Sequence, residues 1–71
     1  MDLQQIRQDE QQYIMHTYNR FDVALVSGRG AIAKDVGGRE YIDFTSGIGV
    51  NCLGYSDSGW VAAVTGQAEK I

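Results

Sequence analysis

The chain has 71 residues, contains no proline and carries a formal net charge of −3. Its six Lys and Arg residues are scattered and form no basic stripe, which argues against nucleic-acid binding. No apolar run approaches the roughly 20 residues that span a bilayer, and the polar, acidic N-terminus is unlike a signal peptide. We therefore expect a cytoplasmic protein with no membrane or nucleic-acid partner.

One cysteine and one histidine exclude an internal disulfide and a Cys/His zinc site, so no metal site is predicted. A chain this short buries only about 60% of the surface that its unfolded state exposes, so its own core is marginal. Small domains usually compensate with a disulfide, a metal or a partner. The composition therefore favours self-association, or association with further chain.

Residues 2–16 are predicted to form a helix. Apolar side chains recur there at a helical spacing, at Leu3, Ile6, Tyr13, Ile14 and Thr17. Asp2 can cap the start, and Gln5 three residues later makes a weak capping box. Because the apolar stripe is thin, such a helix is stable only when it docks on another element.

Three short strands are predicted, over residues 23–27, 31–35 and 40–44. The sequences Ser-Gly-Arg-Gly and Val-Gly-Gly-Arg between them are turn signals. Alternation in the third run places Tyr41 on one side and Ile42 on the other. The pattern predicts an antiparallel meander, one face of which can pack on a helix.

A glycine-rich stretch, residues 45–56, is predicted as a loop. Asp57 or Ser58 can then cap a last helix, over about residues 58–70. Its apolar face has helical spacing and consists of Trp60, Val61, Val64, Ala68 and Ile71. The predicted fold class is α+β, in the order helix, three-stranded meander, glycine-rich loop, helix, with residues 1–71 as a single unit.

The loop sequence Gly-Ile-Gly-Val-Asn-Cys-Leu-Gly-Tyr does not match either common phosphate-binding motif. Tyr55 occupies the lysine position of a P-loop. Gly47, Gly49 and Gly54 are spaced too widely for a dinucleotide fingerprint, and an antiparallel meander is the wrong context for one.

Other candidate chemical groups have ordinary structural alternatives. Cys52 and His16 could form a catalytic pair, although a buried cysteine acting as a small hydrophobe is the favoured interpretation. Tyr18 beside Arg20 could bind a ligand or simply mark an exposed helix end. Three carboxylates could act as acids or bases, although solvated or capping roles are commoner: Asp35, Asp43 and Asp57.

The stretch TYNRFDVALVSGRGAIAKDVGGREYIDFTSGIGVNCLGY resembles the N-terminal region of class III, pyridoxal-phosphate-dependent aminotransferases, closest to the acetylornithine aminotransferases. The family has a Tyr-x-Arg lead-in, a Gly-x-Gly…Asp-x-x-Gly-(Lys/Arg)-x-Tyr-(Ile/Leu)-Asp-Phe run and a (Ser/Ala)-Gly-Ile-(Gly/Ala)-Val-Asn-x-Leu-Gly loop. These correspond here to residues 18–25, 28–44 and 46–54. The following helix is also similar, so the resemblance covers essentially the whole chain.

This resemblance implies a small-domain fragment of a fold-type I aminotransferase. The complete enzyme would be a dimer that moves an amino group between N-acetylornithine and 2-oxoglutarate in arginine biosynthesis. The glycine loop would line the substrate end of the cleft, near the dimer interface. The implied substrate-binding positions are Tyr18, Gly47, Ile48 and Asn51. Ile48 falls at a position where relatives have a residue that shapes substrate preference, and ornithine-type relatives carry an aromatic residue there. The structural alternative is that Ile48 fills a core and that Tyr18 only packs against its neighbours.

The chain also departs from the family pattern. Asp22 replaces a proline, and residues 54–58 replace a Gly-His-Cys-His-Pro run. Lys34 and Lys70 do not match the lysine that holds the cofactor as a Schiff base in such enzymes. The resemblance therefore implies no catalytic residue here and no pyridoxal phosphate bound by these residues alone. The implied partners are the remainder of an aminotransferase chain, or a second copy. A freestanding, noncatalytic α+β interaction module is the alternative.

Overall fold

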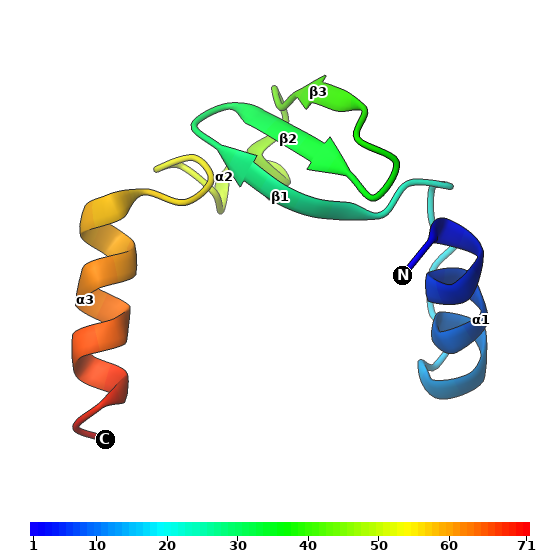
Figure 1. Ribbon diagram of the computed structural model, residues 1–71, viewed down its shortest axis with the longest axis horizontal. Helices are drawn as coiled ribbons and strands as arrows, with labels where there is room; N and C mark the ends of the chain where they lie inside the picture. The colour runs from blue at the N-terminus through cyan, green and yellow to red at the C-terminus, as the bar shows by residue number, and fades with distance from the viewer.

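The computed structural model describes all 71 residues and confirms the α+β fold class. The elements are α1 (Leu3–Tyr13), β1 (Leu25–Arg29), β2 (Ile32–Asp35), β3 (Glu40–Ile42), α2 (Ser46–Gly49) and α3 (Ser58–Ala68). The strands form one antiparallel sheet in the order β1-β2-β3. Figure 1 shows the sheet as the top of an arch, from which α1 and α3 extend on the same side.

Helix α1 begins as predicted and ends early. The Asp2 carboxylate accepts a hydrogen bond from the Gln5 backbone N–H, so Asp2 is the N-cap. The expected capping box is not formed, because the Gln5 side chain donates to Asp9 instead. The helix stops at Tyr13 rather than at residue 16, since Ile14 is extended and the residues after it hydrogen-bond to each other locally.

The strand boundaries differ from the predicted ones at the first turn. Strand β1 continues through Ser27 and Gly28, and the chain reverses in a two-residue turn at Gly30 and Ala31. Gly30 has φ +59°, which glycine adopts without steric cost. The register shifts between Leu25 and Ser27, so β1 carries a bulge there.

One carboxylate follows β2 and another follows β3, and each shapes the turn that comes next. After β2, Asp35 accepts hydrogen bonds from the Gly37 and Arg39 backbone N–H groups, which fixes the turn into β3. Strand β3 ends at Ile42, two residues before the predicted boundary. The Asp43 backbone N–H still donates to the Ala31 carbonyl, while the Asp43 side chain accepts from the Thr45 and Ser46 backbone N–H groups and turns the chain into the following loop.

Helix α3 begins after Asp57, whose carboxylate accepts from the Trp60 backbone N–H. Of the two capping candidates, Asp57 is therefore the one used. The helix contains no charged side chain between its first and last residues, Ser58 and Ala68. Neither long helix contacts the sheet or the other helix, so the sheet face that could pack on a helix has no helix on it. No helix combines the length and the apolar character that crossing a bilayer requires.

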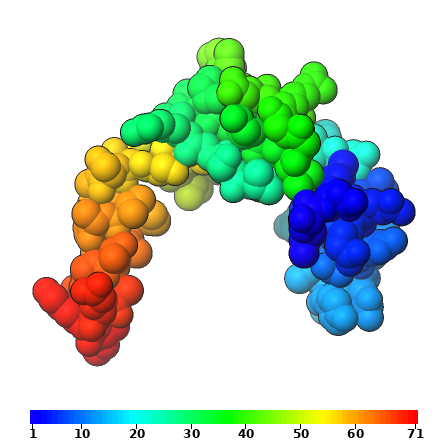
Figure 2. Space-filling model, viewed as in Figure 1, coloured from blue at the N-terminus to red at the C-terminus, as the bar shows by residue number.

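The chain has almost no interior of its own. Only Ala33, in the middle of the sheet, is buried, at 2% exposure. The Cα radius of gyration is 14.6 Å, against about 11 Å for a compact domain of this length. The accessible surface is 6302 Å², whereas a compact monomer of this mass exposes about 4,400 Å². Figure 2 shows the space left open between α1 and α3. The arch therefore leaves its apolar side chains uncovered.

Candidate functional site

Asp43 organises the loop that joins β3 to α3. Its Oδ1 accepts hydrogen bonds from the backbone N–H groups of Thr45 (2.9 Å) and Ser46 (2.8 Å) and from the Thr45 hydroxyl (3.1 Å). Successive backbone N–H groups of this kind form a concave anion site, and here the anion is the protein's own carboxylate. The Tyr55 hydroxyl donates to the Asp43 Oδ2 at 2.7 Å. Asp43 thus ties the two ends of the loop together.

These contacts set the ionisation of both side chains. The hydrogen bond from Tyr55 holds the pKa of Asp43 below its ordinary value of 3.8, and the loop N–H groups add to the effect. The same bond raises the pKa of Tyr55 above 10.0, because it favours the protonated phenol. Near neutral pH the pair is therefore a carboxylate and a neutral phenol, and its role is to stabilise the loop rather than to transfer a proton. We call this hydrogen-bonded pair the Asp43–Tyr55 clasp.

The first half of the loop is a left-handed turn. Four successive residues have positive φ: Ser46 (45°), Gly47 (61°), Ile48 (61°) and Gly49 (82°). The two glycines accept this conformation freely, but a β-branched residue there is strained. Ile48 is also 98% exposed. The predicted loop therefore contains a short, strained turn in which a large apolar side chain is exposed to solvent.

The second half of the loop docks on the β1–β2 hairpin. Tyr55 and Gly30 exchange two backbone hydrogen bonds, at 3.0 and 2.8 Å, and the Ser56 hydroxyl donates to the Gly28 carbonyl. A Cβ on Gly28 would lie 2.7 Å from the Tyr55 ring, and one on Gly54 would lie 2.7 Å from the Gly30 carbonyl oxygen. These two glycines therefore allow the loop and the hairpin to approach each other closely, and phosphate binding is not their role.

The larger of two hollows, of about 750 Å³, lies beside this framework and is open and mostly apolar. Its walls include Phe21, Leu25, Ala33, Tyr41, Phe44, Gly47 and Tyr55. Gly28, Ala33 and Tyr41 stand beside one another in register across the three strands. The hollow thus joins one row of the sheet, the connection before β1 and the start of the glycine loop.

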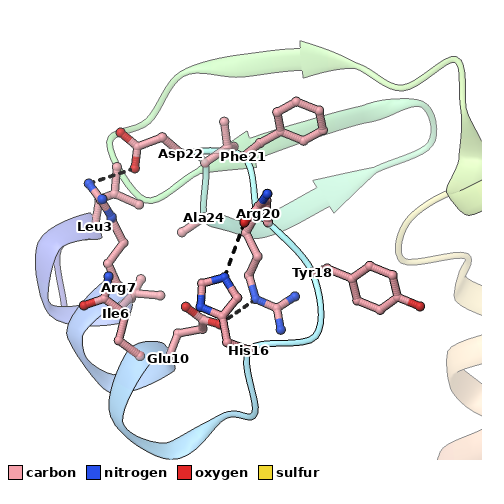
Figure 3. Close-up of a pocket in the computed structure, with 13 residues that line it drawn as sticks. Leu3, Ile6, Arg7, Glu10, His16, Tyr18, Arg20, Phe21, Asp22 and Ala24 are labelled. Carbon is pink, nitrogen blue, oxygen red and sulfur yellow. Dashed lines mark hydrogen bonds and ion pairs between the residues drawn. The ribbon is translucent and has the colours of Figure 1, made fainter.

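The second hollow, of about 260 Å³, separates α1 from the connection that leads to β1 (Figure 3). Two ion pairs cross it: Arg7 with Asp22 at 3.2 Å, and Arg20 with Glu10 at 2.8 Å. Because both arginines are already paired with carboxylates, neither offers a free charge to an anionic ligand. The ion pairs instead hold α1 against the connecting segment.

The structure does not gather the four implied substrate-binding residues into one pocket. Tyr18 borders the smaller hollow, but its ring points away from α1 (Figure 3). Gly47 lines the larger hollow, and Ile48 projects into solvent. Asn51 is half-buried and lies in a separate hollow of about 310 Å³, beside Gly54. Three of the four positions lie in the glycine loop and Tyr18 lies in the connection before β1, and no single hollow gathers them.

The structure also places the other candidate groups, which are Cys52, His16 and three carboxylates. Cys52 is exposed, which corrects the expectation of a buried cysteine, and it shares no hollow with His16. Each candidate carboxylate accepts hydrogen bonds from backbone N–H groups: Asp35, Asp43 and Asp57.

The two tyrosines that bond to these carboxylates were not among the candidates from sequence. The Tyr41 hydroxyl donates to Asp35 at 2.8 Å, as Tyr55 does to Asp43. Tyr41 lies opposite Ala33 in the β2–β3 register, which brings it near Asp35, two residues further along the chain from Ala33; this register is a property of the fold. Tyr55 offered no local signal, because its partner lies twelve residues earlier.

The two lysines show no arrangement suited to holding an aldehyde cofactor. Lys34 lies 3.7 Å from Glu40 on the exposed sheet, and Lys70 follows the end of α3. Neither lines the larger hollow. The residues present therefore do not fit a pyridoxal-phosphate site by themselves.

Comparison with known proteins places this geometry in context. No family model matches the chain. The chain is 49% identical over 67 residues to the acetylornithine aminotransferase of Haemophilus ducreyi, which covers 94% of this chain and 17% of that protein. It superposes on the N-acetylornithine aminotransferase of Stenotrophomonas maltophilia with a TM-score of 0.70, at 46% identity over 79% of this chain and 15% of that one.

A third match extends over nearly all of the fold. The ornithine aminotransferase of Toxoplasma gondii aligns with a TM-score of 0.89 and 28% identity, across 99% of this chain and 16% of that chain. In that protein, pyridoxal phosphate partly occupies the active site. The chain spans less than a fifth of the length of each of these relatives.

Sequence and structure thus agree on one class: the chain corresponds to a segment of a class III aminotransferase. More particularly, it matches the N-terminal region of acetylornithine aminotransferase.

Proposed function

We propose that this chain supplies the substrate-side loop and part of the dimer interface of an acetylornithine aminotransferase. The complete enzyme would transfer an amino group between N-acetylornithine and 2-oxoglutarate in arginine biosynthesis. The observation that carries the proposal is the 49% identity to the Haemophilus ducreyi enzyme across nearly the whole chain. The exposed sheet and helix faces support it, since they need a covering that a longer chain would provide.

The glycine loop is the part that meets substrate in this proposal. Asp43 and Tyr55 fix its two ends, so its left-handed turn is held in shape before any ligand arrives. Ile48 then presents an apolar side chain to the far end of the substrate, and Gly47 lets the substrate approach the backbone. Tyr18 and Asn51 border the same end of the cleft once the rest of the enzyme brings the parts together.

Pyridoxal phosphate supplies the electron sink for amino transfer when it is bound. This chain contributes no lysine placed to hold the cofactor, so the 71 residues alone are expected to be inactive. Their role is to orient the substrate and to exclude water from it. The cofactor lysine and the phosphate site would be provided by chain outside these residues.

A chimera tests the proposal directly. This chain replaces the 67 matching residues of the Haemophilus ducreyi enzyme, and transamination of N-acetylornithine with 2-oxoglutarate is measured. We expect the chimera to be active and a version that lacks the segment to be inactive. A well-folded chimera that binds pyridoxal phosphate but shows no transamination would contradict the proposal.

The chimera also tests Ile48. Replacing it with tyrosine should lower kcat/KM for N-acetylornithine relative to that for ornithine, since a larger ring would crowd the acyl group. Val50→Tyr is the matched control, because Val50 lies in the same loop and is also largely exposed. If both variants change the ratio equally, Ile48 has no special role in substrate preference.

A second function is favoured by one observation, the near absence of an interior. A noncatalytic interaction module would expose apolar faces in the same way and would bury them against a partner. An inactive chimera, together with tight association of the 71-residue chain, would favour this module over the enzyme segment.

A further inference from the structure

Two residues at the start of the glycine loop connect the Asp43 carboxylate to the rest of the loop. The backbone N–H groups of Thr45 and Ser46 donate to the Asp43 Oδ1. The Thr45 carbonyl oxygen accepts from the Ile48 N–H at 2.9 Å, and the Ser46 carbonyl oxygen accepts from the Asn51 N–H at 2.8 Å. Two of the implied substrate-binding positions are therefore each linked to Asp43 through a single intervening residue.

The other oxygen of this carboxylate is held from the far end of the loop. The Tyr55 hydroxyl donates to the Asp43 Oδ2 at 2.7 Å, and no other side chain donates to that oxygen. A hydrogen bond to an ionised oxygen is shorter and roughly twice as strong as one between neutral groups. Because its two oxygens are bonded from opposite ends of the loop, the carboxylate has a fixed orientation.

The position of the Tyr55 hydroxyl is set by the β1–β2 hairpin. The Tyr55 backbone exchanges two hydrogen bonds with Gly30, and its ring lies so close to Gly28 that a Cβ there would be 2.7 Å from the ring. The next residue, Ser56, donates its hydroxyl to the Gly28 carbonyl. The hairpin therefore fixes Tyr55, and Tyr55 in turn fixes Asp43.

The turn that carries Ile48 depends on being held by its backbone. Ser46 and Ile48 have φ of 45° and 61°, and residues with a Cβ stay in this conformation only where the surrounding structure imposes it. The Ile48 side chain is 98% exposed, so its own packing does not impose the conformation. The backbone bonds that lead back to Asp43 are what remains to hold the turn.

We infer that Tyr55 is a positioning residue for substrate preference: its hydroxyl, acting through Asp43, holds the turn that presents Ile48 to the substrate. The same contact orders the backbone at Asn51. This inference rests on the proposed function, because Ile48 affects substrate preference only if the glycine loop meets substrate. Without the hydroxyl, the loop leaves its competent arrangement for part of the time, and the apparent KM rises by the reciprocal of the competent fraction.

The test compares two phenol-to-phenyl variants in the chimera described above. Tyr55→Phe removes the hydroxyl and keeps the ring on Gly28. We expect KM for N-acetylornithine to rise about 5- to 10-fold while kcat changes by less than about twofold, since bound substrate selects the competent loop. The ratio of kcat/KM for N-acetylornithine to that for ornithine should fall as well.

Tyr41→Phe is the matched control. It removes a similarly short bond, from the Tyr41 hydroxyl to Asp35 at 2.8 Å, on the same sheet. Asp35 holds the turn between β2 and β3 and does not bond the glycine loop. This variant should therefore leave KM and the substrate ratio unchanged. An equal change in both variants would mean that Tyr55 acts only on general stability, and would refute its positioning role.

A double variant tests whether Tyr55 acts through Asp43. In a chimera that already carries Asp43→Ala, adding Tyr55→Phe should change KM no further, because the two changes remove the same contact. A further rise as large as that in the single Tyr55→Phe variant would overturn the proposed route.

Crystal structures of the chimeras separate this inference from the proposed function. In Tyr55→Phe, residues 45–51 should show raised B-factors or a second conformer, and in Tyr41→Phe they should match the parent chimera. An inactive parent chimera would contradict the proposed function. A turn that is equally well ordered in Tyr55→Phe would overturn the positioning role, whether or not the chimera is active.

Discussion

Replacing Gly54 with alanine should release the glycine loop from the hairpin. Gly54 has φ +78°, a conformation that costs a residue with a Cβ about 1–2 kcal/mol. The new Cβ would also lie 2.7 Å from the Gly30 carbonyl oxygen, closer than real Cβ contacts occur. Because Gly30 is held through its backbone bonds to Tyr55, the clash must separate the two segments.

Amide hydrogen exchange measures this release at the residues concerned. The Gly30 and Tyr55 N–H groups are both donors in the bridge, at 3.0 and 2.8 Å. A loss of one to two kcal/mol lowers their protection about 5- to 30-fold. Strain and clash add, so the observed loss should reach or exceed the upper part of that range.

Gly66→Ala is the matched control. Gly66 lies in α3, no atom stands within 4 Å of a Cβ built there, and alanine should stabilise the helix by about 1 kcal/mol. Protection of the Gly30 and Tyr55 amides should be unchanged in this variant. Unchanged protection in Gly54→Ala, or an equal loss in both variants, would refute the close-approach argument.

Two further predictions concern the carboxylates. Asp57→Ala should destabilise α3 by about 0.5–2 kcal/mol through loss of the N-cap, measured as lost helical circular dichroism, whereas Ser58→Ala should have little effect. The hydrogen bond from Tyr55 holds the pKa of Asp43 below 3.8 in the folded chain. The ionised Asp43 therefore stabilises the fold fully at pH values above its unfolded-state pKa, and this stabilisation is lost as pH falls through the lower folded-state pKa. The protonated Tyr55 likewise stabilises the fold fully below its unfolded-state pKa of 10.0, and this stabilisation is lost as pH rises through its higher folded-state pKa. Tyr55→Phe should therefore flatten the dependence of the urea midpoint on pH at both extremes; an unchanged profile would contradict the clasp.

The types of the main elements could be predicted because their signals are local. Asp2 and Asp57 cap the helices they precede, within three residues of the N–H groups they accept from. The paired glycine turns and the alternation of β3 are likewise contained in short windows. Helix, meander, loop and helix therefore follow from the sequence in the correct order.

Boundaries and partners depend on contacts between distant residues. Gly28 has the sequence of a turn but lies in β1, because Ser56 and the Tyr55 ring pack on it from a loop 27 residues away. Asp43 holds the loop after β3 through a hydrogen bond from the Tyr55 hydroxyl, twelve residues later. No short-range pattern indicates either pairing.

The sequence by itself determined the types of the main elements, the Asp2 cap of the first helix and the resemblance to a family, because each is encoded in residue order along the chain. Only the tertiary structure decided that the glycine loop is clasped by Asp43 and Tyr55, that Ile48 is held in a left-handed turn, and that both long helices lack a covering. These depend on where the backbone brings distant atoms together, and on how little apolar surface 71 residues can bury.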